Sequence, residues 1–108
     1  MVEYTLNLDL VFGSLADPTR RGILRQVSRR ERPIKELSAC YQMTFAGIAK
    51  HVHILEQAGL IHKRKEGREQ IISANPKTIA MSQRHLEKYQ KLQSTRYTQL
   101  DTLLSNFN

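Results

Sequence analysis

In residues 44–61, apolar side chains recur at helical spacing while the other positions hold small and basic residues. Ile48, Val52 and Leu55 form the apolar stripe, so we expect this side of a helix to pack inward. The early positions that would face outward are small, basic or methyl-bearing: Ala46, Ala49, Lys50 and His53. A slim helix with a basic outer face fits the major groove of DNA, where side chains can hydrogen-bond to base edges.

The same segment carries signals for where this helix begins and ends. The hydroxyl of Thr44 can accept a hydrogen bond from a free amide of the first turn. Gly59 readily adopts the positive φ that closes many helices. Upstream, Ile34 and Leu37 predict a short helix that reaches a turn at residues 41–43. Two short helices joined this tightly, the second with a basic face, predict a helix-turn-helix.

Two further helices are expected before this motif. Apolar residues predict a short helix over residues 8–15, and Asp17 can cap a second helix that starts at Pro18 and runs to about residue 28. Gly22 lies inside this second helix, where glycine costs about 1 kcal/mol relative to alanine. A close approach by another helix at Gly22 would explain the glycine.

After Gly59 the apolar pattern changes to that of two short strands, over residues 60–65 and 69–74. Gly67 supplies the positive φ that the turn between them requires. Pro33 allows a short extended step before the third helix. A basic hairpin that directly follows a helix-turn-helix is a wing, so the fold class predicted is a mainly α winged helix-turn-helix with a small β-hairpin.

A long final helix is predicted from Asn75 and Pro76, which suit the cap and the first position. Its apolar residues keep a spacing of three to four, and the helix could reach about 45 Å. One small domain cannot cover such a stripe, so we expect a homodimer through the N- and C-terminal helices. We read residues 1–108 as one domain, with a DNA-binding core over about 8–75 and a dimerisation helix over about 76–108. The expected dimer contacts are Leu8, Val11, Phe12, Leu86, Tyr89, Leu100, Leu103, Leu104 and Phe107.

The chain has 108 residues and a formal net charge of +7, which favours a polyanionic partner. Seven basic residues against one acid, Glu31, lie between residues 19 and 35, and four more basic residues lie between 63 and 68. These clusters flank the proposed groove helix in sequence, as phosphate contacts around a base-reading element would. From the first cluster we expect Arg20 and Arg21 to contact the DNA backbone.

No stretch is long and apolar enough to cross a membrane, and the first residues show no secretory signal. The one cysteine, Cys40, cannot form an internal disulfide. We therefore expect a reducing, cytoplasmic location and no membrane partner.

Three segments together resemble the ArsR/SmtB family of bacterial winged-helix repressors: residues 10–24, 50–61 and 64–68. The resemblance implies a homodimer on a palindromic operator that overlaps a promoter, and release of double-stranded DNA by a metal or another signal. The family's groove contacts would fall on Thr44, Phe45, Ala46, Ala49 and Lys50, and its wing contacts on Arg64, Lys65 and Arg68.

Phe45 departs from the family pattern, because many members carry a polar residue there. Its ring could touch a thymine methyl group. Alternatively, the ring packs back onto the neighbouring turn.

No metal site and no cofactor are expected. The metal-sensing members pair cysteines in the third helix or pair acid and histidine ligands on the last, but here Cys40 stands alone and His85 and Glu87 diverge around a helix. We expect Cys40 to be a buried apolar residue, with a redox switch as the alternative. The inducer would then be an unidentified small-molecule or redox effector.

No catalytic constellation is present, so we do not expect an enzyme. Two other functions compete with operator binding. The chain could be a protein-interaction module with only non-specific DNA binding, or a winged helix that binds RNA. Few aromatic residues are available to stack on splayed bases, so duplex DNA is favoured over RNA.

Overall fold

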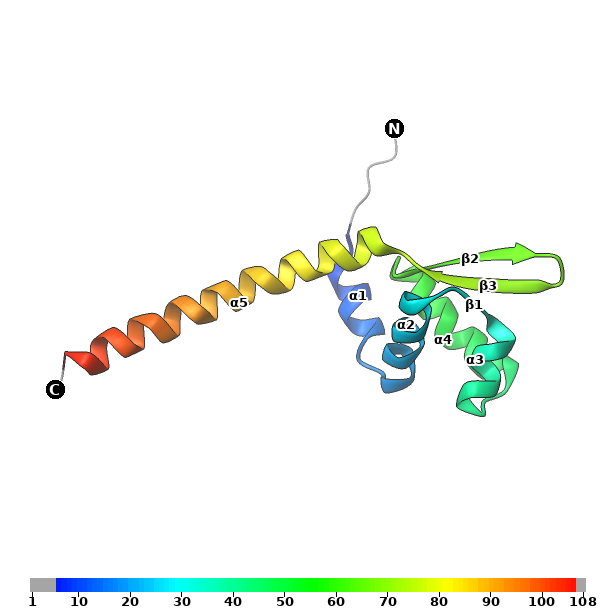
Figure 1. Ribbon diagram of the computed structural model, residues 1–108, viewed down its shortest axis with the longest axis horizontal. Helices are drawn as coiled ribbons and strands as arrows, with labels where there is room; N and C mark the ends of the chain where they lie inside the picture. The colour runs from blue at the N-terminus through cyan, green and yellow to red at the C-terminus, as the bar shows by residue number, and fades with distance from the viewer. Residues whose placement is uncertain (1–5, 107–108) are drawn as a thin grey trace, which may run out of the picture.

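The computed structural model describes residues 6–106, which form five helices and three strands around one core (Figure 1). In chain order these are α1 (Leu8–Ser14), α2 (Pro18–Arg29), β1 (Arg32–Pro33), α3 (Ile34–Tyr41), α4 (Phe45–Gln57), β2 (Ile61–Glu66), β3 (Glu69–Ala74) and α5 (Pro76–Ser105). The mainly helical winged helix-turn-helix expected from the sequence is confirmed, with α3 and α4 as its two short helices.

The predicted helix starts and turns are also confirmed. The side chains of Asp17, Thr44 and Asn75 each accept a hydrogen bond, at 3.0–3.2 Å, from a backbone amide two or three residues later. Gly59 and Gly67 both have positive φ, of 78° and 62°. Local sequence signals therefore fix where α2, α4 and α5 begin and where the hairpin turns.

The core lies where α1–α4 meet the sheet, and its largest members are fully buried. Val11 is among them at 0% exposure, on α1 where that helix packs against α4. The expectation that Val11 lies in a dimer interface is therefore wrong. Its side chain is already enclosed by its own chain and has no surface left to offer a partner.

The sheet has three strands in the order β1-β3-β2, all antiparallel. The extended step expected at Pro33 pairs with Ile71, and Arg32 pairs with Ile72, so β1 closes the free edge of β3. The sequence predicted the hairpin to within one residue but not this third strand. A two-residue strand is too short to show the alternation that marks strands in a sequence.

Cys40 is exposed, contrary to the expectation that it is buried. The buried stripe of α3 runs through Ile34 and Leu37 and continues to the half-buried Tyr41, a step of four rather than three. Cys40 therefore turns away from the core, and its Sγ accepts a hydrogen bond of 3.4 Å from the side chain of Gln26.

Gly22 faces the Tyr41 side chain of α3, which is the close approach that the sequence suggested. A Cβ added at Gly22 would overlap the Tyr41 hydroxyl oxygen and lie 3.2 Å from the ring carbon that carries it. The same hydroxyl accepts a hydrogen bond of 3.1 Å from Gln26. Glycine here lets α2 and α3 approach closely enough to make that contact.

Gly22→Ala is therefore expected to lower the free energy of unfolding by about 1–2 kcal/mol, even after the gain of about 1 kcal/mol in helix propensity. Urea denaturation measures this change. Removing the hydroxyl with Tyr41→Phe should recover much of the loss in the double variant, with Tyr41→Phe alone as the control. A Gly22→Ala variant as stable as the parent would mean that the contact does not constrain the packing.

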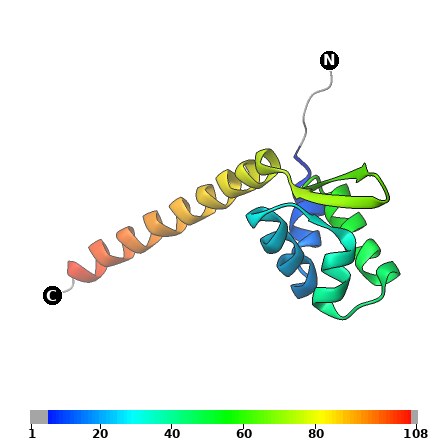
Figure 2. The same cartoon turned by 45° about the vertical axis from the view of Figure 1, so that its right-hand side comes forward.

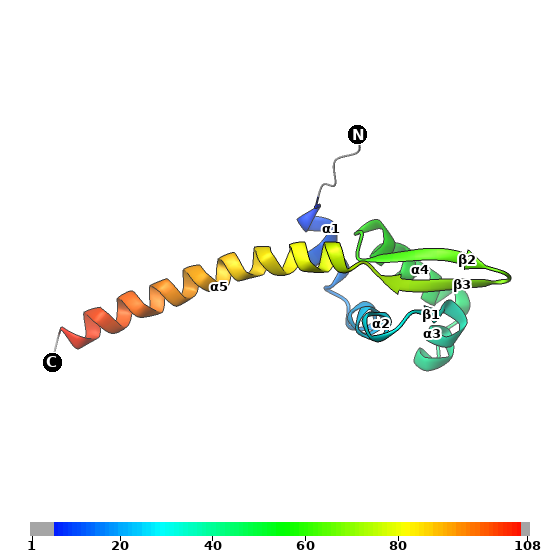
Figure 3. The same ribbon diagram turned by 45° about the horizontal axis from the view of Figure 1, so that its top comes forward.

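Helix α5 leaves the core after its first turns and projects away from it in Figure 1, Figure 2 and Figure 3. Every residue from Leu86 to Asn106 is exposed. The molecule is accordingly elongated, measuring 69 × 40 × 21 Å. Within residues 6–106, no helix has the length and apolar content needed to cross a membrane.

Candidate nucleic-acid interface

Helix α4 has the buried face that the sequence predicted, and its outer face matches the prediction except at Ala49. Ile48, Val52 and Leu55 are at most 1% exposed. On the other face, Ala46, Lys50 and His53 are exposed, as are the cap Thr44 and the first residue Phe45, while Ala49 is half-buried against the core. The outer face of α4 therefore offers slim side chains and one lysine to a partner.

The hairpin of β2 and β3 lies at the same end of the molecule as α3 and α4, away from the C-terminal end of α5 (Figure 1, Figure 3). Residues 62–68 are all exposed. Lys63 Nζ lies 3.8 Å from a carboxylate oxygen of Glu56, which ties the hairpin to α4. The basic hairpin and the exposed face of α4 therefore lie side by side and form one surface unit.

Three cations of this unit have no acidic partner within the described part of the chain. Lys50 lies on α4, Lys65 on β2 and Arg68 in the turn, and none of them forms an ion pair there. Their charges are available to phosphates or base edges without breaking an existing contact.

Arg64 differs from these three because it is already paired. Its guanidinium donates two hydrogen bonds of 2.7 Å to Glu31, which lies between α2 and β1, and one of 3.0 Å to Glu66. The hydrogen bonds from Arg64 lower the pKa of the Glu31 carboxyl, and those carboxylates raise the pKa of Arg64. The sequence predicted Arg64 as a wing contact but did not indicate that Glu31 pairs with its guanidinium and competes with DNA for it.

Arg20 and Arg21 contact the end of α1 rather than pointing freely outward. Arg20 Nε donates to the carbonyl of Ser14 at 2.6 Å, and Arg21 Nη1 donates to the carbonyl of Leu15 at 2.8 Å. Arg20 Nη1 also lies 3.3 Å from Nδ1 of His51, on the inner edge of α4. Both arginines therefore fasten the corner between α1 and α2, a role that the sequence did not reveal.

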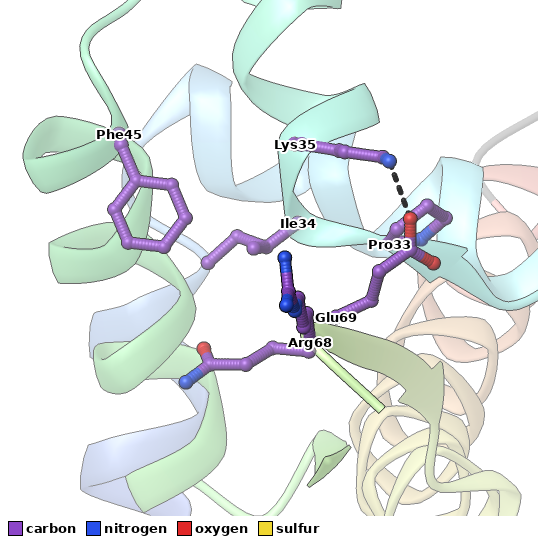
Figure 4. Close-up of a pocket in the computed structure, with 7 residues that line it drawn as sticks. Pro33, Ile34, Lys35, Phe45, Arg68 and Glu69 are labelled. Carbon is purple, nitrogen blue, oxygen red and sulfur yellow. Dashed lines mark ion pairs between the residues drawn. The ribbon is translucent and has the colours of Figure 1, made fainter. Parts of the chain in front are cut away.

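Phe45 lines an open hollow of about 160 Å³ between the starts of α3 and α4 and the turn end of the hairpin (Figure 4). In Figure 4 its ring lies beside Ile34 of α3, with Arg68 beyond. The side chain remains 55% exposed, so Phe45 lies outside the core. An ion pair between Lys35 and Glu69 joins α3 to β3 beside the same hollow.

The described residues hold no group of three or more histidine, cysteine or acidic side chains placed to bind a metal ion. His51 is half-buried and His53 is exposed, and they point to different sides of α4. Cys40 lies on α3 beside Gln26.

Comparisons with known proteins agree with this geometry. A family model described as a helix-turn-helix domain matches residues 15–64. An uncharacterized HTH-type transcriptional regulator of Bacillus subtilis, YuzN, is 36% identical over 76 residues, which are 64% of this chain and 83% of that protein.

Solved structures resemble the whole fold. The crystal structure of an ArsR family transcriptional regulator matches with a TM-score of 0.75 and 32% identity, over 87% of this chain and 97% of that one. An ArsR-like transcriptional regulator from Rhodococcus sp. RHA1 matches with a TM-score of 0.74 and 28% identity, over 89% and 91% of the two chains. Such regulators are generally not enzymes. The chain belongs to the ArsR family of helix-turn-helix transcriptional regulators.

Proposed function

We propose that this regulator is a repressor that binds a palindromic operator as a homodimer and blocks the promoter that overlaps it. The observation that carries the proposal is the exposed face of α4, with Lys50 on it and the unpaired cations Lys65 and Arg68 on the adjacent hairpin. Such an arrangement suits a base-reading helix flanked by phosphate contacts.

In the proposed complex, each copy inserts α4 into a major groove on the same side of the duplex, one helical turn of about 34 Å or a multiple of it apart. Lys50, with Thr44 and Ala49, reads base edges, while Phe45 and Ala46 meet thymine methyl groups. His53 lies further along the same face. Lys65 and Arg68 bind phosphates or enter the minor groove beside α4.

The proposed dimer uses the exposed apolar side chains of α1 and α5. On α1 these are Phe12 and the half-buried Leu8. On α5 they are Leu86, Tyr89, Leu100, Leu103 and Leu104, each 50–61% exposed. Phe107, the remaining predicted contact, lies outside the described residues.

We also propose that DNA is released by a small-molecule or redox signal other than a metal ion. A single cysteine and scattered histidines supply no convergent set of soft ligands. The exposure of Cys40 is compatible with a redox signal.

Selection from a random duplex library at low salt, followed by titration of the enriched site at several salt concentrations, tests the function. We expect an inverted repeat to be enriched and its affinity to fall steeply with salt, because bound phosphates release counterions. Failure to enrich any duplex would overturn the proposal. Weak, sequence-independent binding would favour the protein-interaction alternative, and preference for single-stranded RNA would favour an RNA-binding role.

The pairing of Arg64 with Glu31 gives a second prediction. Glu31→Gln removes a carboxylate that competes for Arg64, so we expect DNA affinity to rise about two- to fivefold. The salt slope, which is the slope of log affinity against log salt concentration, should steepen by up to about 0.9, the value for one additional phosphate contact. Because the pKa of Glu31 is lowered, the ion pair is formed at neutral pH and is lost only as the pH falls through that lowered value.

Glu87→Gln is the matched control, since it removes the same charge from the exposed side of α5, far from the hairpin. If both variants gained DNA affinity equally, the change in net charge alone, and not the release of Arg64, would account for the higher affinity.

A further inference from the structure

Another hollow, of about 440 Å³, lies between α2, the end of α1 and the first turn of α5. Its apolar residues, Leu15, Leu24 and Ile79, are half-buried and pack against the core. The hollow therefore has an apolar floor, and its volume is in the range of small-molecule sites. Its polar residues are all exposed and form the rim: Arg21, Arg25, Ser28 and Arg29.

The three arginines of this rim lie one helical turn apart on α2. Like charges at this spacing repel one another and destabilise a helix. Within residues 6–106, the side chains of Arg25 and Arg29 have no hydrogen-bond or ion-pair partner. Arg21 donates from Nη1 to the carbonyl of Leu15, which holds its guanidinium beside the floor. Among the described residues that line the hollow, none is acidic, so the rim lacks a counter-charge.

A ligand that satisfies both parts of the hollow is an anion with an apolar body. A guanidinium binds a carboxylate through two parallel hydrogen bonds, and the Ser28 hydroxyl can donate another. An apolar chain would cover the floor and remove it from water. A small inorganic anion would leave the floor bare, and an uncharged apolar molecule would leave the arginines without a counter-charge.

We propose that this hollow binds a carboxylic acid with an apolar chain, of the size of a medium-chain fatty acid, and that this acid is the small-molecule signal that releases DNA. The binding of the acid depends on the hollow alone, whereas its role as the signal rests on the proposed function. None of the residues that line the hollow is among the proposed dimer contacts.

The position of the hollow links the acid to DNA release. Helix α2 packs against α4, the proposed base-reading helix, and α5 carries proposed dimer contacts. A ligand held between α2 and the start of α5 touches both parts whose relative position sets the spacing of the two α4 helices. It releases DNA if it binds more tightly to a spacing that the operator does not fit.

Calorimetric titration of the full chain with decanoate tests the site. We expect one decanoate to bind per chain, with a dissociation constant below about 1 mM. Hexanoate, which has a shorter chain, and decanol, which lacks the carboxylate, should each bind at least about fivefold more weakly. Inorganic phosphate should not compete with decanoate. Binding of several decanoates per chain, binding of decanol as tight as that of decanoate, or displacement by phosphate would overturn the proposed site.

The double variant Arg25→Gln/Arg29→Gln should raise the dissociation constant for decanoate about tenfold, because it removes two of the three charges of the rim. Lys88→Gln/Arg96→Gln is the matched control, since it removes the same net charge from the exposed part of α5. All four substituted side chains are exposed, so we expect both variants to melt at the temperature of the parent. An equal loss of decanoate binding in both variants would assign the effect to net charge and overturn the site.

Operator titration with and without decanoate tests the role of the acid as the signal. At saturating decanoate, the affinity of the parent for the selected operator should fall at least about fivefold. At the same concentration, the affinity of Arg25→Gln/Arg29→Gln should fall much less. An unchanged operator affinity in the decanoate-bound parent would overturn the role as the signal. Failure to select any operator would instead overturn the proposed function, and the calorimetric test of the site would be unaffected.

Discussion

Leu100→Asp is expected to separate the proposed dimer and to weaken binding to a two-half-site operator at least about a hundredfold. The substitution removes two leucine side chains from the interface, worth about 2 kcal/mol each, which alone raises the dissociation constant about a thousandfold. The two new carboxylates would lie in an apolar interface, which adds a desolvation cost. Without the second subunit, the second half-site contact is no longer intramolecular, so the gain from bivalency is lost.

Sedimentation equilibrium measures the mass, and titration of duplexes with one and two half-sites separates assembly from DNA contact. The affinity for a single half-site should be nearly unchanged, because Leu100 belongs to residues 86–106, which are all exposed, and α5 projects away from the core (Figure 1). Thr102→Asp adds the same charge on another side of α5 and should leave both properties intact. If the Leu100→Asp variant remained a dimer, α5 would not be the main contact between the subunits.

Much of the fold could be predicted from the sequence because the signals are local. The cap at Thr44 and the glycines at 59 and 67 act within a few residues of themselves, and the structure has each in its expected role. The apolar stripe of α4 identifies its buried face for the same reason: helical periodicity determines which side chains share a side.

Three features that the sequence analysis missed depend on a partner far away in the sequence. Arg64 and Glu31 are 33 residues apart, and no pattern in either segment announces their ion pair. β1 exists because β3 offers it a free edge, not because two residues carry a strand signal. The burial of Val11 likewise depends on where α4 runs.

For the candidate site, the sequence predicted the outer face of α4 except at the half-buried Ala49, but it did not predict which cations are free. The structure leaves Lys50, Lys65 and Arg68 without acidic partners in the part of the chain that it describes, whereas Arg20 and Arg21 bind main-chain carbonyls. Mutagenesis should therefore separate these two groups. Substitutions at Arg20 should lower stability, while those at the free cations should act on DNA binding alone.

Lys50→Ala is expected to cost about 1–3 kcal/mol of binding to the selected operator and much less on random duplex DNA. Lys50 projects from the outer face of α4, five residues after the helix starts at Phe45, where a groove-bound helix meets base edges. The loss should concentrate on the base pair that Lys50 contacts, so operators altered at that position should bind the variant and the parent equally.

Lys65→Ala is the matched comparison, because it removes the same charge from the wing. If Lys65 binds a phosphate, its loss should weaken operator and random DNA by similar factors and reduce the salt slope by about 1. Competition titrations with both duplexes at several salt concentrations separate the two patterns. If Lys50→Ala instead followed the pattern expected for Lys65→Ala, Lys50 would be a phosphate contact, and sequence reading would have to reside in Thr44, Phe45 and Ala46. An α4 that reads bases through those side chains would depend on apolar contact with thymine methyl groups, and the selected half-site should then be rich in A·T pairs.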